Sequence, residues 1–381
     1  MSFPFKGAVP VTDRGASSSD EAATQSVFTA EPPRLQLDDV VAIAWHVYGL
    51  RVDAQLLSSE RDQNFLLRVE DGRAYVLKAT HPAEDPRVTD FQTQAQLYMM
   101  RGDAGLAIPQ LHPTRDGSWV YWHEGPAGVR RAIRLINFVA GTPLWQAGRT
   151  PAQRVALGQA LAAFDLALAG FDHPMADHEL LWDLQHAGSV ARLLRLIEAP
   201  DRRALAERQM AHFLENTRPA LGRLQRRQVI HNDLNAYNVM VAQDDADRIA
   251  ALLDFGDMVR APLAQDLGVA AAYQLEDAAD PLTPAATTLI AAYHRALPLS
   301  EDELVLLPDI IAARLLITVA ITGWRAKEHP ENRNYILRNN GLAWTGLTRL
   351  AALAPGQAQD IVLRACRGAA PARLETRGES A

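Results

Sequence analysis

The sequence contains a single cysteine, Cys366, among its 381 residues. This scarcity excludes a disulfide framework and a thiolate zinc site, and it fits a reducing, cytoplasmic location. We expect Cys366 to be a partly buried packing residue rather than a nucleophile, because isolated buried cysteines usually serve packing.

Basic clusters and long apolar runs are also missing. The net charge is −7 and the pI is about 5.9, and no run of Lys and Arg stands out, which argues against nucleic acid as a partner. The most apolar stretch, residues 310–324, carries Arg314 in its middle. Because it looks too short to span a bilayer as a helix, we expect no membrane partner. Residues 1–35 lack the apolar segment of a signal peptide and are expected to form a disordered leader, with a flexible tail at 367–381.

The rest of the chain divides into two halves. Hydrophobic side chains make up 48% of the residues, and the length fits two lobes with a cleft between them. Strand patterns occur at 55–57, 65–69, 74–79, 119–122 and 131–136, and helical patterns at 37–48, 88–101, 151–169, 204–227, 284–296 and 302–324. The sequence therefore predicts an α+β fold of two lobes: a five-stranded antiparallel N-lobe at 36–136 and a helical C-lobe at 137–366.

A short strand-rich segment interrupts the helical half. Strand patterns at 228–230, 239–242 and 250–253 predict one small β-ribbon, and its loops carry the chemistry. Asp233 and Asn238 lie five residues apart on the first loop, and Asp254 follows the third strand. Phosphoryl transfer needs a carboxylate that takes the proton of the acceptor and oxygen ligands that hold a hard cation against the phosphates. We therefore expect Asp233 to be the base, and Asn238 and Asp254 to bind Mg²⁺.

Lys78 stands near the end of the strand pattern at 74–79. Alone it would pass for a solvated surface lysine. With a helix after it and the loop of Asp233 downstream, it becomes a candidate for binding the α- and β-phosphates of a nucleotide.

In this order, Lys78, the loop His231–Asn238 and Asp254-Phe255-Gly256-Asp257 resemble the motifs of the protein-kinase-like fold, in its aminoglycoside phosphotransferase branch. The segments at 59–65, 134–143 and 231–235 are most similar to hydroxylysine kinase and to the kinase domains fused to class III aminotransferases. The resemblance covers residues 37–353 and implies a small-molecule kinase that uses ATP or GTP with Mg²⁺.

The resemblance also implies roles for individual residues. The loop at 58–64 would cover the phosphates, through its amides and the side chains of Ser59, Gln63 or Asn64. The hinge at 136–139, with Ile136 and Phe138, would pair with the purine. His231 would organise the catalytic loop, and Asp266 would brace it.

Two departures from the wider fold stand out. No G-x-G-x-x-G loop is present, and no Ala-Pro-Glu segment follows Asp254, so a protein substrate is disfavoured. Gln92 stands where a glutamate usually pairs with the lysine, and we expect it to accept one hydrogen bond from Lys78. In having a glutamine at this position, the sequence resembles the hydroxylysine kinase group. The alternatives are an impaired active site and a catalytically silent nucleotide-binding module.

The acceptor is the least constrained part of the prediction. Asp257 or the face of Trp324 would suit an ammonium group, and Arg325 or Arg333 a carboxylate. This mixture favours a hydroxylated amino acid such as hydroxylysine. An amino-alcohol kinase and an aminoglycoside kinase remain the alternatives, and oligomeric state is not indicated.

Overall fold

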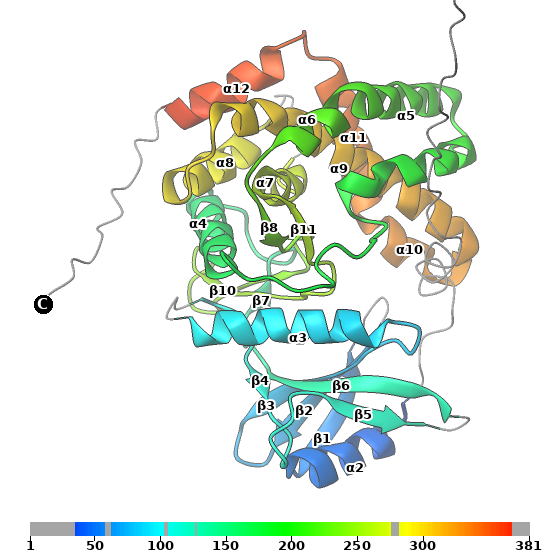
Figure 1. The fold of residues 1–381 in the computed structure, drawn as a ribbon, viewed down its shortest axis with the longest axis vertical. Coiled ribbons are helices and arrows are strands. Elements are labelled where there is room, and N and C mark those ends of the chain that lie inside the picture. Colours follow the sequence, from blue (N-terminus) through cyan, green and yellow to red (C-terminus); the bar gives the residue numbers. More distant parts are fainter. Residues whose placement is uncertain (1–34, 58–61, 103–105, 126–127, 276–281, 368–381) are drawn as a thin grey trace, which may run out of the picture.

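The computed structural model describes residues 35–57, 62–102, 106–125, 128–275 and 282–367. Apart from Leu35 and Arg367, the predicted leader and tail therefore lie outside the described residues, and so does Ser59. A strand-rich lobe and a larger helical lobe meet along helix α3 (Pro86–Arg101), as Figure 1 shows. The two-lobed α+β fold that the sequence predicts is confirmed.

The N-lobe contains one antiparallel sheet. Its strands run in the order β1-β2-β3-β6-β4, with β5 also paired to β6. The five predicted strands are present, and the two-residue strand β4 adds a sixth that the sequence analysis missed. The bounds are β1 (Val52–Leu57), β2 (Gln63–Val69), β3 (Ala74–Ala79), β4 (Leu111–His112), β5 (Tyr121–Glu124) and β6 (Arg130–Asn137).

Two helices flank this sheet, as predicted. Helix α2 (Leu37–Tyr48) buries Val40, Ile43 and Ala44 in a cluster with side chains of β2, β3 and β6. Asp85 is the N-cap residue of helix α3, and its carboxylate accepts the N–H of Arg87 at 2.8 Å. The buried side of α3 belongs to the core of the C-lobe, so this helix ties the two lobes together.

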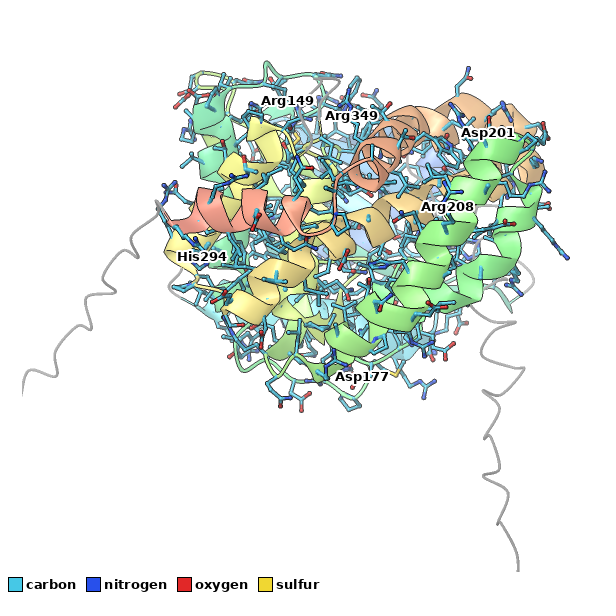
Figure 2. All side chains as sticks on the ribbon, turned by 90° about the horizontal axis from the view of Figure 1, so that it is seen from above. Arg149, Asp177, Asp201, Arg208, His294 and Arg349 are labelled. Carbon is cyan, nitrogen blue, oxygen red and sulfur yellow. The ribbon has the colours of Figure 1, made fainter. Side chains whose placement is uncertain are left out.

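The C-lobe is helical, as predicted. The long pattern at 204–227 is not one helix, because a π-helical turn at Phe213–Thr217 separates α5 from α6. Figure 2 looks onto this lobe, where Asp201 and Arg208 are exposed on α5. The helices are α4 (Pro151–Ala167), α5 (Pro200–His212), α6 (Arg218–Arg223), α7 (Leu263–Ala272), α8 (Pro284–Ala296), α9 (Glu301–Glu328), α10 (Arg333–Ile336), α11 (Asn340–Ala351) and α12 (Gln357–Arg367), with a 3₁₀ segment at Leu184–Leu196.

The predicted single β-ribbon of the C-lobe is wrong. Strand β8 (Arg227–Ile230) pairs with β11 (Val259–Pro262), whereas β9 (Val239–Val241) pairs with β10 (Ile249–Leu252) and with the short β7 (Thr142–Pro143). The two small sheets place the loop after β8 beside the turn after β10. Asp233 and Asp254 are carried by that loop and that turn.

Helix α9 is the central helix of the C-lobe. It packs closely on α7 at Gly268, where an added Cβ would lie 2.3 Å from the side chain of Ile310. A glycine is needed there because any side chain would push the helices apart. The expectation that this apolar stretch is too short for a membrane is wrong: α9 has 28 residues, enough to span one by length and composition. Since 89% of its most apolar window is buried in the fold, it serves as a core helix.

Cys366 is buried on α12 with a free thiol, and burial raises its pKa to about 11. A thiol with this pKa is protonated at neutral pH and is a poor nucleophile. The packing role is supported, and the cytoplasmic location stays a prediction.

Candidate active site

Asp266 holds the loop between β8 and β9 through hydrogen bonds to its backbone. Its two carboxylate oxygens accept the backbone N–H groups of His231 and Asn232, each at 2.8 Å. Asn232 adopts a left-handed conformation with φ of 63°, which asparagine tolerates better than most residues. The bracing role predicted for Asp266 is confirmed by these contacts.

His231 is fully buried and uses both ring nitrogens inside the protein. Its Nε2 lies 3.0 Å from the carbonyl oxygen of Leu253, and its Nδ1 accepts the N–H of Asp233 at 3.3 Å. Because both nitrogens are occupied, His231 connects the two catalytic loops and does not face an acceptor. This placement agrees with the organising role predicted for it.

Asp233 receives hydrogen bonds on both oxygens. Arg314 donates to Oδ1 at 2.6 Å and Tyr273 at 3.4 Å, while Asn235 and Asn238 donate to Oδ2 at 2.8 and 3.0 Å. These four donors fix the direction of the carboxylate. Such an orientation is what a base needs to take a proton from one particular hydroxyl.

The pKa of Asp233 is raised to about 6, first by burial. The charge of Arg314 opposes this rise in pKa, and the charge of Asp257 adds to it. A carboxylate with a pKa near 6 is ionised at neutral pH yet more basic than an exposed one, which suits proton abstraction. Asp257, a predicted ammonium-binding residue, therefore lies within electrostatic reach of the base.

The two predicted metal-binding residues lie on neighbouring loops. Asn238 donates through Nδ2 to the backbone oxygen of Asp233 at 2.9 Å as well as to its carboxylate, so its Oδ1 is the oxygen left for a cation. The carbonyl of Asn238 also accepts the N–H of Leu253 at 2.8 Å, directly before Asp254. Asp254 has a φ of 62°, and its side chain is 55% exposed.

Within the described ranges, no group of three or more His, Cys, Asp or Glu side chains forms a complete metal cage. One carboxylate and one carboxamide oxygen nevertheless fit Mg²⁺, which prefers oxygen ligands and keeps positions for phosphates and water. The donor set therefore matches a cation that arrives with a nucleotide.

Lys78, on β3 of the N-lobe, reaches Asp254 of the C-lobe. Its Nζ is 3.3 Å from Oδ1 of Asp254. In the sheet, Lys78 stands between Asn64 on β2 and Arg134 on β6, its direct partners across the strands. The three polar side chains form one row on one face of the sheet, and a phosphate chain would be bound along such a row.

Contrary to the prediction, Gln92 does not accept a hydrogen bond from Lys78. Its Oε1 accepts from Arg134 at 3.0 Å, and its Nε2 lies 3.4 Å from Glu84. The side chain that donates to Gln92 is Arg134 on the neighbouring strand β6, because Lys78 points toward Asp254. Gln92 thus positions the buried guanidinium of Arg134 rather than the ammonium group of Lys78.

We therefore expect Gln92→Ala to act mainly on stability. Without Gln92, Arg134 keeps its burial and loses its acceptor, so the free energy of unfolding in urea should fall by about 1–3 kcal/mol. Gln92→Glu is the matched control, since it restores an acceptor. A tenfold loss of turnover at unchanged stability would instead support the pairing with Lys78.

The other predicted nucleotide-binding residues fall in different places. Gln63 bonds to the backbone of Leu35 at 2.6 Å and so anchors the segment before α2 rather than a phosphate. Asn64 keeps a buried Oδ1 with no donor. Ile136 lines a cavity of about 30 Å³ together with Lys78 and Asp254, whereas Phe138 is 40% exposed outside it.

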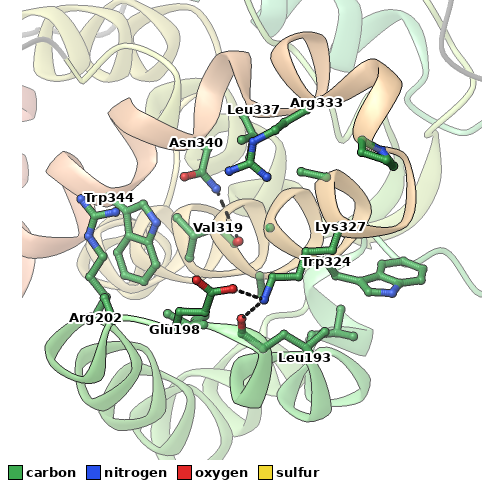
Figure 3. A pocket seen from close by; sticks show the side chains of 17 residues that line it. Leu193, Glu198, Arg202, Val319, Trp324, Lys327, Arg333, Leu337, Asn340 and Trp344 are labelled. Carbon is green, nitrogen blue, oxygen red and sulfur yellow. Dashed lines mark hydrogen bonds and ion pairs between the residues drawn. The ribbon is translucent and has the colours of Figure 1, made fainter.

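Trp324 and Arg333 are not brought to Asp233. They line a separate groove of about 590 Å³, in which Lys327 pairs with Glu198 at 2.8 Å (Figure 3). Trp324 lies ten residues after Arg314 on α9, about 15 Å along the helix axis. The position of these two residues therefore does not match the predicted contact with the acceptor.

Arg325 is buried on another face of α9. Burial and the nearby charge of Arg338 lower its pKa to about 10. Arg325 thus lies near the segment that follows α10, and it lines neither the groove of Trp324 and Arg333 nor a cavity that contains Arg314.

A second cavity lies next to the base and was not predicted. It has a volume of about 230 Å³, and Arg314 and Tyr273, which both contact Asp233, form part of its wall. Arg338 and Tyr237 line it as well, with the guanidinium of Arg338 4.5 Å from the ring centre of Tyr237. The one signal in the sequence was Arg314, a charge inside an apolar helix.

An oriented carboxylate, oxygen ligands for a cation and a lysine, brought together in one cleft, are the groups that phosphoryl transfer requires. The chain belongs to the phosphotransferase enzyme family APH, whose family model matches residues 53–304. It is a small-molecule kinase.

Known proteins agree with this assignment. The chain is 21% identical to hydroxylysine kinase of Mus musculus over 359 residues, 88% of this chain and 93% of the relative. A solved microcompartment-associated aminopropanol kinase has a TM-score of 0.67 at 20% identity, with 87% of this chain and 100% of that chain covered. An amicoumacin kinase solved with AMP-PNP and Ca²⁺ has a TM-score of 0.62 at 15% identity, covering 80% and 93%. At these identities the solved structures support the fold alone.

Proposed function

We propose that the chain transfers the γ-phosphate of ATP or GTP, with Mg²⁺, to the hydroxyl group of a small amino-containing metabolite, and that a hydroxylysine-like amino acid is the favoured acceptor. The observation that carries the chemistry is the orientation of Asp233 by Arg314, with a pKa of about 6. The chain's similarity to hydroxylysine kinases supports the acceptor class.

In the proposed reaction, Lys78 binds the phosphates, and the hinge at 136–139 holds the purine. Asn238 and Asp254 would bind Mg²⁺, which supplies charge neutralisation for the transferred phosphoryl group. The acceptor oxygen forms a bond to the γ-phosphorus while the bond from that phosphorus to the bridging oxygen of the β-phosphate breaks. The hydroxyl proton passes to Asp233, and the electron pair of the broken bond leaves on the nucleoside diphosphate.

The cavity beside Asp233 supports an acceptor that carries a carboxylate. Arg338 and Arg149 lie on its wall, and none of the described residues that line it is acidic. A polycationic aminoglycoside would gain little there, whereas a carboxylate would meet guanidinium groups and an ammonium group could approach Asp257. Arg325 and Arg333, the arginines predicted from the sequence, do not line this cavity.

A panel of acceptors tests the function. The pure protein is incubated with ATP or GTP, Mg²⁺ and hydroxylysine, ethanolamine, choline, homoserine or an aminoglycoside, and release of nucleoside diphosphate is measured. We expect the largest acceptor-dependent release with hydroxylysine and none after chelation of Mg²⁺. Release with the aminoglycoside alone would overturn the amino-acid assignment.

Two arginine variants separate the cavities. Arg338→Met should raise the KM for the amino acid by about tenfold or more, the size expected for a lost hydrogen bond to a charged group, and should spare an amino alcohol that lacks the carboxylate. Arg333→Met, in the groove of Figure 3, is the matched control and should leave both KM values unchanged. The reverse result would move the acceptor to that groove, and equal effects on both acceptors would favour an amine-only substrate.

A further inference from the structure

Two carboxyl groups lie in contact beneath the catalytic loop. Asp165 on α4 and Asp266 on α7 are both fully buried, and their carboxyl groups lie close enough for a hydrogen bond between them to affect the pKa of each. Among the described residues, no cationic side chain forms an ion pair with either carboxyl group. Two ionised carboxylates buried in contact would repel strongly, so one proton must be shared between them.

The hydrogen bonds show where this proton lies. Both oxygens of Asp266 accept backbone N–H groups of the catalytic loop. Oδ2 of Asp165 accepts the hydroxyl of Tyr293 at 2.5 Å. Oδ1 of Asp165 is buried and has no donor. A proton on this oxygen satisfies it, because Oδ1 then donates to Asp266 instead of facing it as a second acceptor.

The surrounding charges agree with this placement. Burial, followed by the charge of Asp266, raises the pKa of Asp165 well above its ordinary value. Burial also raises the pKa of Asp266, but the backbone N–H groups of His231 and Asn232, which donate to its two oxygens, oppose that rise. Tyr293, whose pKa is itself raised by burial, and Arg226 are the other titratable groups near Asp165. Asp266 is therefore the member of the pair that stays ionised.

We propose that Asp165 is a positioning residue that acts as a neutral carboxylic acid: it donates a proton from Oδ1 to Asp266, and Asp266 in turn fixes the loop that carries Asp233. The kinetic part of this inference rests on the proposed role of Asp233. The location of the proton does not, and it can be measured without turnover.

Infrared spectroscopy tests the proton directly. At pH 8, where Asp233 is ionised, the wild type should show the carbonyl band of a protonated carboxylic acid, and Asp165→Asn should lack it. Asp309→Asn is the matched control, because Asp309 is another carboxyl whose pKa burial raises, paired with His212 away from the loop. Absence of the band from the wild type, or its loss in Asp309→Asn alone, would overturn the proposal.

Kinetics tests the positioning. Asp165→Asn keeps a donor for Asp266 and an acceptor for Tyr293, so kcat should stay within about threefold of wild type. Asp165→Ala removes both and should lower kcat by about tenfold or more, or unfold the protein at lower urea. Equal losses of kcat in both variants would contradict the donor role.

The pH dependence of the free energy of unfolding is a second test, and it does not require an active enzyme. A carboxyl whose pKa is raised by folding contributes stability below about pH 4, its unfolded pKa, and loses it as the pH rises toward the folded pKa. The free energy of unfolding of the wild type should therefore fall with pH relative to Asp165→Asn. Parallel pH curves for the two proteins would count against a buried proton on Asp165.

Discussion

Asp233→Asn should lower turnover by about 10²- to 10⁴-fold, the usual loss when a general base is removed. An amide at this position cannot take the acceptor's proton. The wild type should also lose kcat/KM as the pH falls through about 6, because protonation of Asp233 inactivates the base. In Asp233→Asn this loss of kcat/KM at low pH should disappear, leaving a low residual rate that does not change with pH.

The control for this variant is nucleotide affinity, measured by calorimetry. The amide would present an N–H group to Asn235 and Asn238, which donate to Oδ2 of Asp233 in the wild type. If nucleotide affinity falls together with turnover, the loop has been displaced and the loss is not that of the base alone. Near wild-type turnover would remove Asp233 from the mechanism.

The motifs were the most predictable part of the site. Lys78, Asp233, Asn238 and Asp254 are brought to one cleft because each lies in a short strand or within a few residues of the end of one, and pairing fixes these strands. Local strand patterns and the order of the motifs were enough to predict this. The pairing of β8 with β11 could not be predicted, because strands of three or four residues have no pattern that selects a partner.

Contacts made by helices were harder to predict. Gln92 was placed on the correct helix, but Arg134 reaches it because Lys78 is drawn to Asp254. Such competition between neighbouring donors is decided by three-dimensional packing and not by spacing. Trp324 and Arg325 are adjacent in sequence yet lie on different faces of α9, since successive residues of a helix point about 100° apart.

Arg314 was not among the site residues predicted from the sequence. It lies inside the apolar stretch at 310–324, and no motif in the sequence marks it as a site residue. Close packing at Gly268 brings α9 against α7 and puts this arginine beside the base. A charged residue inside an apolar core helix deserves to be treated as a candidate site residue, because burying it costs free energy unless it has a partner.

In Arg314→Lys, the loss of kcat/KM at low pH should begin at a higher pH than in the wild type. Arg314 now donates to Asp233, to Tyr273 and to the carbonyl of Trp182, and its charge lowers the pKa of Asp233 against the effect of burial. A lysine keeps a charge but cannot make this fork of hydrogen bonds. A weaker partner leaves the pKa of Asp233 higher, so more of the base is protonated at neutral pH.

We expect kcat/KM of Arg314→Lys at pH 7 to fall about twofold if the pKa of Asp233 rises from about 6 to about 7, and about tenfold if it rises to about 8, with most of the loss recovered near pH 9. Arg314→Met should show a larger shift, although the unpaired buried carboxylate would also cost about 3–5 kcal/mol of stability, so Arg314→Lys is the variant that remains measurable. The pH dependence of kcat/KM, measured beside urea unfolding, separates the two effects. A loss of activity in Arg314→Lys that is equal at every pH would mean that Arg314 orients Asp233 without tuning its basicity.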